Sequence, residues 1–249
     1  MLSIVIPTLN EVAALGRLLP ELSRSFPEAE AIVVDGGSTD GTQDLVRRFP
    51  RVRLIEAARG RARQMNAGAR VAGGSTILFL HADTALPPDA PEAIEDALRV
   101  PGVVGGRFDV RFDNRRPVFT LIAAMMNLRS RLTGICTGDQ ALFVRRQTFD
   151  ELQGYPDIPL MEDIALSRRL KRLGRIACLR LRVITSARKW EREGALRTIA
   201  LMWVLRLLYW AGVAPTRLHR WYYGGTVDTS PAVRGSADSS DPRQPADTR

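Results

Sequence analysis

Carboxylates that could bind a cation or take up a proton occur at three places where a predicted element ends or begins. Asp35 and Asp83 each follow an apolar run, and Glu162-Asp163 opens an amphipathic segment. Aspartate is also common as a turn or helix-capping residue, and that explanation is sufficient for any one position alone. All three positions are expected at one edge of a sheet, and this convergence favours a shared chemical site.

Two further segments carry groups that could hold a ligand. In Gly134–Gln140, the residues Thr-Gly-Asp-Gln come directly before a predicted strand, which suits hydrogen bonding to a hydroxylated ligand. Arg59–Arg63 begins a predicted helix, where backbone N–H groups and guanidinium groups favour a pyrophosphate. Each segment also has a plain interpretation, a glycine-containing turn for the first and a solvated basic face for the second.

The elements that must position these groups alternate between strands and helices over the first 85 residues. Short apolar runs typical of buried parallel strands are separated by segments whose apolar residues recur at helical spacing. The predicted strands are 2–6, 31–34, 52–56 and 77–80, and the predicted helices are 11–25, 42–48 and 61–72. This order predicts an α/β fold, a mostly parallel sheet with helices on both faces. In such sheets, ligands bind beyond the carboxyl ends of the strands.

The rest of the chain adds further elements. Helices are predicted over 87–98, 117–132, 146–152 and 160–173, and strands over 105–112 and 140–144. We divide the chain into a domain at 1–190, a helical region at 191–224 and a disordered tail at 225–249. The tail is predicted because it is rich in Ser, Pro, Asp, Gly and Arg and has almost no large apolar residues.

The composition excludes collagen-like, coiled-coil and fully disordered chains. The formal net charge is +9, with 34 Arg and two Lys, and a basic surface attracts phosphates, nucleic acid or anionic lipid. No nucleic-acid partner is expected, because no helix-turn-helix, zinc or RNA-binding motif accompanies the charge. Cys136 and Cys178 make no disulfide framework and no secretory signal opens the chain, so a cytoplasmic setting is expected.

Aromatic residues gather in the carboxy-terminal region, where all four Trp and three of the four Tyr follow residue 189. The apolar segment 199–213 contains Arg206 and is shorter than the ~20 residues that span a bilayer. Ten basic residues and one acidic residue occupy 168–192. Two interpretations stay open. Either a helix packs on the sheet among surface arginines, or the region contacts the anionic inner face of the cell membrane and brings a lipid to the site.

Two segments, Ile4–Glu11 (IVIPTLNE) and Val33–Thr42 (VVDGGSTDGT), span the ends of the first two predicted strands. They resemble the opening of family 2 glycosyltransferases with the GT-A fold. Leu78–Thr84 (LFLHADT) resembles their metal-binding Asp-x-Asp segment, and Leu160–Asp163 (LMED) resembles their Glu-Asp motif.

Two more segments narrow the resemblance, which covers residues 1–224. With Thr137–Gln140 (TGDQ) and Ser186–Arg192 (SARKWER), the set is similar to the small bacterial subgroup described as arsenosugar-biosynthesis-type glycosyltransferases. The resemblance makes 1–190 a GT-A domain, with a nucleotide-binding half at 1–85 and an acceptor half at 86–190.

The resemblance implies an inverting enzyme that moves a sugar from a nucleotide-diphosphate donor to an acceptor hydroxyl or carboxylate of a small molecule or lipid. Such a displacement needs a base for the acceptor proton and a cation for the leaving diphosphate. By the family pattern Asp163 is the base, with Glu162 beside it, and Asp83 binds Mg²⁺ or Mn²⁺.

The family pattern also assigns the remaining positions to the two substrates. The donor site is expected to contain Pro7, Thr8, Asn10, Glu11, Asp35, Ser38, Arg61, Arg63, His81 and Ala82. Arg61 or Arg63 is expected near the phosphates. The acceptor site is expected to contain Gly138, Asp139, Gln140, Arg188 and Trp190.

Two positions depart from the family pattern. His81 replaces the first Asp of Asp-x-Asp, which leaves one carboxylate for the metal. His81 is expected either to face the ribose or phosphate, or to cap the strand. Gly36 stands where many relatives have a second Asp that contacts the nucleobase. A UDP-sugar remains the expected donor.

Two other functions stay open. A sugar-phosphate nucleotidyltransferase would share the fold and the metal, but such enzymes open with a glycine-rich basic loop, and Pro7–Glu11 contains no Gly. A non-catalytic module that binds a nucleotide sugar or an anionic lipid would tolerate Asp163→Asn, whereas an enzyme would lose turnover.

Overall fold

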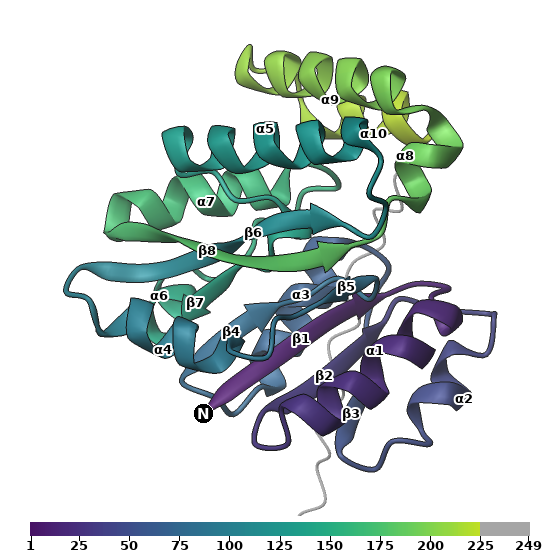
Figure 1. Cartoon of the computed structure of the whole chain (residues 1–249), viewed down its shortest axis with the longest axis vertical. Coiled ribbons are helices and arrows are strands. Elements are labelled where there is room, and N and C mark those ends of the chain that lie inside the picture. The colour runs from purple at the N-terminus through teal and green to yellow at the C-terminus, as the bar shows by residue number, and fades with distance from the viewer. Residues whose placement is uncertain (225–249) are drawn as a thin grey trace, which may run out of the picture.

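The computed structural model describes residues 1–224, apart from the side chain of residue 196. At its centre lies an eight-stranded sheet with the order β3-β2-β1-β4-β7-β6-β8-β5 (Figure 1). The strands are β1 (Leu2–Thr8), β2 (Glu30–Asp35), β3 (Val52–Glu56), β4 (Thr76–Phe79), β5 (Thr84–Ala85), β6 (Val103–Phe112), β7 (Phe143–Arg145) and β8 (Arg175–Thr185). Strands therefore come from both the first 85 residues and the following hundred, and all of them share one sheet.

The four strands predicted in the first 85 residues are confirmed, and they are parallel. β1 lies between β2 and β4, and β2 also pairs with β3. Thr8 is in register with Asp35, and Asp35 with Glu56, so β1, β2 and β3 end level with one another. We call the ends of β1, β2 and β4 the carboxyl edge of the sheet.

The second half of the sheet is mixed and differs from the sequence-based expectation at β5, which was not predicted, at β7 and at β8. β7 is antiparallel to both β4 and β6, whereas β8 is parallel to β6. The strand predicted at 140–144 begins only at Phe143, because Gly138–Gln140 forms a 3₁₀ turn, η1, and Ala141 adopts a positive φ of 47°. Strand β8 is absent from the sequence-based prediction, which treats its arginines only as basic surface.

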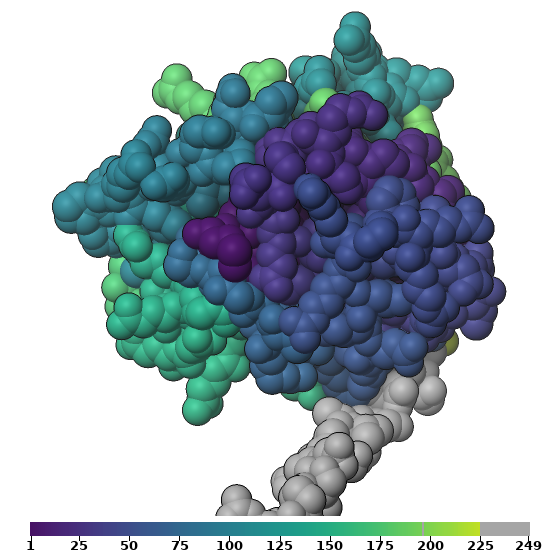
Figure 2. Space-filling view, turned by 90° about the horizontal axis from the view of Figure 1, so that it is seen from below, coloured from purple at the N-terminus to yellow at the C-terminus, as the bar shows by residue number. Residues whose placement is uncertain are grey.

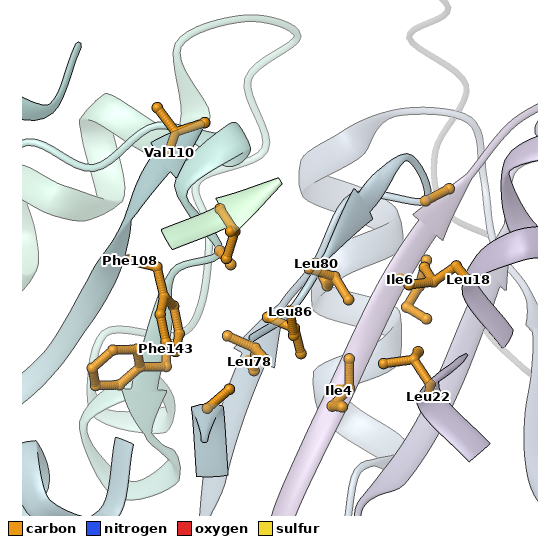
Figure 3. Close-up of a cluster of buried hydrophobic side chains, with 14 of the residues drawn as sticks. Ile4, Ile6, Leu18, Leu22, Leu78, Leu80, Leu86, Phe108, Val110 and Phe143 are labelled. Atoms are coloured by element: carbon orange, nitrogen blue, oxygen red, sulfur yellow. The ribbon is translucent and has the colours of Figure 1, made fainter. Parts of the chain in front are cut away.

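Helices cover both faces of the sheet, as predicted. They are α1 (Val12–Ser25), α2 (Thr42–Val46), α3 (Arg61–Val71), α4 (Ala90–Arg99), α5 (Pro117–Thr133), α6 (Arg146–Glu151), α7 (Glu162–Leu173), α8 (Arg188–Glu193), α9 (Ala195–Trp210) and α10 (Pro215–Tyr223). One apolar cluster joins the sheet to α1, α4 and α5, and a second joins it to α3, α6 and α7. Figure 3 shows the first cluster, in which Ile4 and Ile6 of β1 point toward Leu18 and Leu22 of α1.

The contact between α3 and the sheet depends on a glycine. A Cβ atom added at Gly68 would lie 2.3 Å from a methyl carbon of Val5 and 2.9 Å from one of Val34. The helix can approach β1 and β2 this closely only without a side chain at that position. This close approach holds α3 against β1 and β2.

The carboxy-terminal helices form a third layer beside α7. Leu205 of α9 and Leu218 of α10 pack with Met161 and Ile164 at the start of α7. In Figure 1, α9 lies at one end of the molecule above α5. The view from below shows mainly residues of the amino-terminal half (Figure 2). Across residues 1–224, the helices are all too short or too polar to cross a membrane. The predicted disordered tail lies outside the described residues.

Candidate active site

The loop after β2 is organised around the carboxylate of Asp35. This carboxylate accepts hydrogen bonds from the backbone N–H groups of Gly37 (3.0 Å) and Ser38 (2.9 Å), from the Ser38 hydroxyl and from Gln43 Nε2 (2.8 Å). Burial opposes ionisation, but these hydrogen bonds outweigh it and lower the pKa of Asp35 below its usual value. Asp35, predicted in the donor site, therefore shapes the loop through an ionised, buried carboxylate.

The loops after β1 and β2 are locked together. Asn10, which adopts a positive φ of 55°, donates its backbone N–H to Ser38 Oγ (2.8 Å) and accepts one from Thr39 at Oδ1 (2.8 Å). The backbone N–H of Glu11 donates to Thr42 Oγ1 (3.1 Å). Predicted donor residues Thr8, Asn10, Asp35 and Ser38 are thus brought together at the carboxyl edge.

The side chain of Gln64 on α3 links β1 and β2 near this edge by hydrogen bonds. Its buried Nε2 donates to the backbone carbonyls of Thr8 (2.7 Å) and Val34 (2.8 Å). A Cβ atom added at Gly36 would lie 3.0 Å from the same Nε2. The space that a side chain at position 36 would need is therefore partly filled by Gln64, which sequence reasoning did not single out.

His81 pairs with η1 rather than with the strand that precedes it. Its Nδ1 lies 3.2 Å from Asp139 Oδ1. The other side of the ring faces Gly138, where an added Cβ would lie 2.3 Å from His81 Nε2. Burial opposes the charge of Asp139, but the hydrogen bond and charge of His81, with Arg61 and Lys189, lower the pKa of Asp139 to about 2. His81 therefore joins the predicted donor residues to the predicted acceptor loop.

Glu162 and Asp163 stand at the start of α7, immediately after Met161, a buried residue with a positive φ of 69°. Asp163 Oδ2 accepts a hydrogen bond from the backbone N–H of Gly138 (3.2 Å), and Oδ1 accepts one from the N–H of Ile164 (2.7 Å). Burial and the neighbouring charge of Asp163 raise the pKa of Glu162 to about 7, although Arg61 acts in the opposite direction. Strained backbone and a perturbed carboxyl are typical of functional sites.

The two candidate arginines of α3 take different positions. Arg61 faces the acidic groups. Desolvation by neighbouring atoms acts to lower the pKa of Arg61, but nearby negative charges outweigh it and raise this pKa above its usual value. The largest of these contributions comes from Glu162, followed by Tyr223, Asp139 and Asp163. Arg63 Nε instead donates to both oxygens of Asp157, at 3.0 and 3.2 Å. Of the two, Arg61 is the one whose charge reaches the predicted catalytic carboxylates.

A second pair of carboxylates lies near Arg188. Arg188 Nη2 is 3.4 Å from Glu11 Oε2 and 3.8 Å from Asp83 Oδ2. Burial and the charge of Asp83 raise the pKa of Glu11, and Arg188 partly offsets the increase. Glu11 and Asp83 offer hard oxygen ligands, but residues 1–224 contain no group of three or more His, Cys, Asp or Glu that could hold a metal. These two carboxylates fit a cation that takes its other ligands from phosphate oxygens and water.

A pocket at the carboxyl edge is lined by residues from several of the segments described above. Its lining includes the predicted residues Pro7, His81, Gly138, Glu162 and Asp163, together with Met65, Phe79, Thr137, Leu142 and Tyr155. Tyr155 was missed by sequence reasoning. Its ring packs edge-on against Phe79 at 4.9 Å, and its backbone is fixed by two hydrogen bonds with the side chain of Asn66. The only sequence signal was a polar Asn on the apolar side of α3.

The remaining predicted acceptor residues differ in their surroundings. Gln140 is fully buried and its Oε1 accepts from the Thr137 N–H (3.2 Å), while its Nε2 has no partner within 1–224. Trp190 packs edge-on against Phe112, with ring centroids 5.7 Å apart, and is not among the residues that line the pocket. Ala82, assigned to the donor site, is buried in the core cluster of α1 and α4.

The comparison that decides the family covers more than half of the chain. The model of glycosyl transferase family 2 matches residues 3–151. The chain belongs to this family. The arrangement of a curled, mostly parallel sheet with helices on both faces is the GT-A fold, as the resemblance implied.

Curated family 2 relatives are similar to parts of the chain. Over 93 residues, the chain is 42% identical to the PGL/p-HBAD biosynthesis glycosyltransferase Rv2957 of Mycobacterium tuberculosis. The aligned region makes up 34% of this chain and 36% of the relative. Over 165 residues, it is 27% identical to poly-beta-1,6-N-acetyl-D-glucosamine synthase of Staphylococcus epidermidis. This aligned region makes up 60% of this chain and 40% of the relative. The chain thus spans well under half the length of these relatives.

Solved structures share the fold at low sequence identity. S. aureus TarS 1-349 superposes with a TM-score of 0.59 and 19% identity, over 75% of this chain and 60% of that one. The mannosyltransferase PcManGT from Pyrobaculum calidifontis, solved with GDP-Man and Mn2+, superposes with a TM-score of 0.59 and 24% sequence identity. The superposition covers 74% of this chain and 56% of that one.

Proposed function

We propose that this family 2 glycosyltransferase is inverting and metal-dependent, and that it uses a UDP-sugar. The acceptor is a hydroxyl or carboxylate of a small molecule or lipid. The observation that carries the proposal is the pair Glu162-Asp163 at the carboxyl edge of the sheet, in which Asp163 accepts a hydrogen bond from the Gly138 N–H and both carboxyl groups interact with the charge of Arg61. Carboxylates at the start of a helix beside a basic group suit proton removal next to a leaving diphosphate.

In the proposed reaction, a carboxylate oxygen of Asp163 takes the proton of the acceptor hydroxyl. The acceptor oxygen then forms a bond to the anomeric carbon while the bond from that carbon to the diphosphate oxygen breaks. One displacement inverts the configuration, the proton remains on Asp163, and the electron pair leaves with the diphosphate. Arg61 stabilises the charge on the leaving group.

Glu162 and Asp83 have supporting roles in this proposal. Because the pKa of Glu162 is about 7, this group is partly protonated at neutral pH and can donate a hydrogen bond to a sugar hydroxyl. Asp83, with Glu11 beside it, would hold Mg²⁺ or Mn²⁺, which neutralises diphosphate charge when bound. Arg188 lies where its charge can reach the same phosphates.

The ligands of two structurally similar proteins support a nucleotide-sugar donor but differ in their nucleobase. TarS was solved with UDP-GlcNAc and PcManGT with GDP-Man and Mn2+. A third relative, 32% identical over 117 residues, is named undecaprenyl-phosphate 4-deoxy-4-formamido-L-arabinose transferase, which favours a lipid among the candidate acceptors. We further propose a cytoplasmic enzyme that touches the anionic inner face of the membrane through its carboxy-terminal helices.

Thermal unfolding in the presence of UDP-glucose, UDP-GlcNAc or GDP-mannose, each with Mn²⁺, Mg²⁺ or EDTA, tests the proposal. A donor at one hundred times its Kd adds about 2.7 kcal/mol of stability, which is easily measured. We expect one UDP-sugar to raise the unfolding temperature only with metal. No increase with any donor would contradict the proposal, and an increase with GDP-mannose alone would correct the nucleotide.

A further inference from the structure

An arginine with two buried nitrogens that lack hydrogen-bond partners lies on α5, within electrostatic reach of Asp163. Arg129 Nε and Nη2 are buried and have no hydrogen-bond partner in the part of the chain that is described. A guanidinium group has five N–H donors, and leaving buried donors unpaired is costly. Such a group in a native protein calls for an explanation, and binding of a ligand is one.

Asp109 of β6 is shared by two other arginines, Arg107 and Arg131. Asp109 is paired with the fully buried Arg107, and its Oδ2 also lies 2.5 Å from Arg131 Nη2. Arg107 further donates to Ser130 Oγ (3.0 Å) and to the Asn127 carbonyl (3.1 Å). This network is satisfied without Arg129, so Arg129 is not needed to hold α5 on β6.

A second arginine faces the first from α9. Burial, followed by the charge of Arg206, lowers the pKa of Arg129 to about 10, while Asp163 acts in the opposite direction. Arg129 therefore stays charged at neutral pH, with Arg206 and Asp163 both within electrostatic reach. Arg206 makes no hydrogen bond or ion pair within residues 1–224. The like charges of Arg129 and Arg206 repel one another, and an anion bound to both would offset the repulsion.

The helices that carry the two arginines also expose a large apolar surface. On α5 the exposed side chains recur at helical spacing, at Leu121, Met125, Leu128 and Leu132. On α9 they are Trp203, Val204, Leu207 and Trp210, and Trp210 is 75% exposed. The two helices belong together, since Ile199 of α9 packs against the cluster that contains Phe119 and Ile122 of α5 (Figure 1). Exposed apolar surface of this extent marks an interaction site.

We propose that Arg129 and Arg206 bind the phosphate head group of an anionic amphiphile, whose hydrocarbon chain lies on the exposed apolar faces of α5 and α9. The guanidinium fork matches phosphate oxygens, and two arginines match the charge of a phosphate monoester. The occupant is an anionic amphiphile, because the positive charges and the apolar faces lie on the same two helices. This binding does not depend on the proposed function.

The probe is dodecyl phosphate below its micelle concentration, with dodecanol and inorganic phosphate as matched ligands that lack the head group or the chain. Binding is followed on the full chain by tryptophan fluorescence, which Trp203 and Trp210 of α9 report, and by the unfolding temperature. The variants are Arg129→Gln and Arg206→Gln. Arg17→Gln is the control, because it makes the same charge change at an exposed position of α1.

We expect dodecyl phosphate to bind wild type and Arg17→Gln alike, and to bind Arg129→Gln and Arg206→Gln at least tenfold more weakly. Without ligand, Arg129→Gln should unfold at a temperature no lower than wild type, since it removes an unpaired buried charge. A purely structural role for Arg129 predicts the opposite, a lower unfolding temperature with unchanged ligand affinity.

Three results would overturn the inference. The first is equal affinity of all four proteins for dodecyl phosphate. The second is equal binding of dodecanol, which would leave only an apolar surface. The third is equal binding of inorganic phosphate, which would leave only a free-anion site. A UDP-sugar titration of the same proteins separates this inference from the proposed function: donor binding without dodecyl phosphate binding refutes only the inference, and the reverse refutes only the function.

Discussion

Replacing Glu162 with Gln should make the protein more stable at high pH but not at low pH. The pKa of Glu162 is raised from 4.5 to about 7, first by burial and then by the charge of Asp163. A carboxyl whose pKa is higher in the folded than in the unfolded protein favours folding while it is protonated. This contribution is complete below pH 4.5 and is lost as the pH rises through about 7.

The size of the effect follows from the difference of about 2.5 between the two pKa values. At roughly 1 kcal/mol or slightly more for each pKa unit, full ionisation of Glu162 removes about 3 kcal/mol of stability. Part of this loss has already occurred at pH 5, so about 2 kcal/mol remains between pH 5 and pH 8. A glutamine side chain cannot ionise, and the Glu162→Gln variant should therefore gain about 2 kcal/mol relative to wild type over that interval.

Urea unfolding of wild type and Glu162→Gln at pH 5 and pH 8 measures this difference directly. The comparison of two proteins at each pH cancels the titration of all groups that do not interact with Glu162. Glu151→Gln, an exposed carboxyl at the end of α6, serves as the control and should show no such dependence. If the stability difference between wild type and Glu162→Gln is the same at both pH values, the buried, raised-pKa description of Glu162 is wrong.

Three further substitutions test the packing and charges around the site. Gly138→Ala places a Cβ 2.3 Å from His81 Nε2, so His81 must leave Asp139, and turnover of the donor should fall at least tenfold while the fold is retained by circular dichroism. Gly68→Ala forces a Cβ into Val5 and should lower the free energy of unfolding in urea by about 1–3 kcal/mol. The control is Gly16→Ala, whose added Cβ meets only Leu45 at 3.8 Å and which should be neutral or stabilising. Equal effects of the two substitutions would refute the close approach of α3. Arg188→Gln removes the positive charge beside Glu11 and Asp83 and should tighten Mn²⁺ binding several-fold in calorimetry without nucleotide, and weaker binding would contradict the pairing.

The parallel half of the fold was predictable because each buried strand is a short apolar run followed by polar residues. The order of strands and helices then determines the sheet and places Asp35 and Asp83 at its carboxyl edge. β8 was missed although its sequence carries a signal. Leu179, Leu181 and Val183 alternate with Arg180 and Arg182, which is the period of a strand with one covered face.

The pairs that complete the site could not be predicted from local sequence. His81 and Asp139 are far apart in the chain and meet only because η1 packs beside the end of β4. The choice between Arg61 and Arg63 depends on which side of α3 faces α7. The lack of a hydrogen-bond partner for Arg129 Nε and Nη2 within residues 1–224 likewise follows from the packing of α5. These contacts arise from tertiary packing and leave no spacing signal.

The central claim, that Asp163 is the base of a metal-dependent sugar transfer, is tested most directly by the rate of UDP release from the donor. The comparison uses wild type, Asp163→Asn and the exposed control Asp150→Asn, each with Mn²⁺ or EDTA. We predict that Asp163→Asn loses about 100-fold or more in rate with donor affinity unchanged, that Asp150→Asn keeps the wild-type rate, and that EDTA abolishes turnover. A wild-type rate in Asp163→Asn, or full activity in EDTA, would contradict the account.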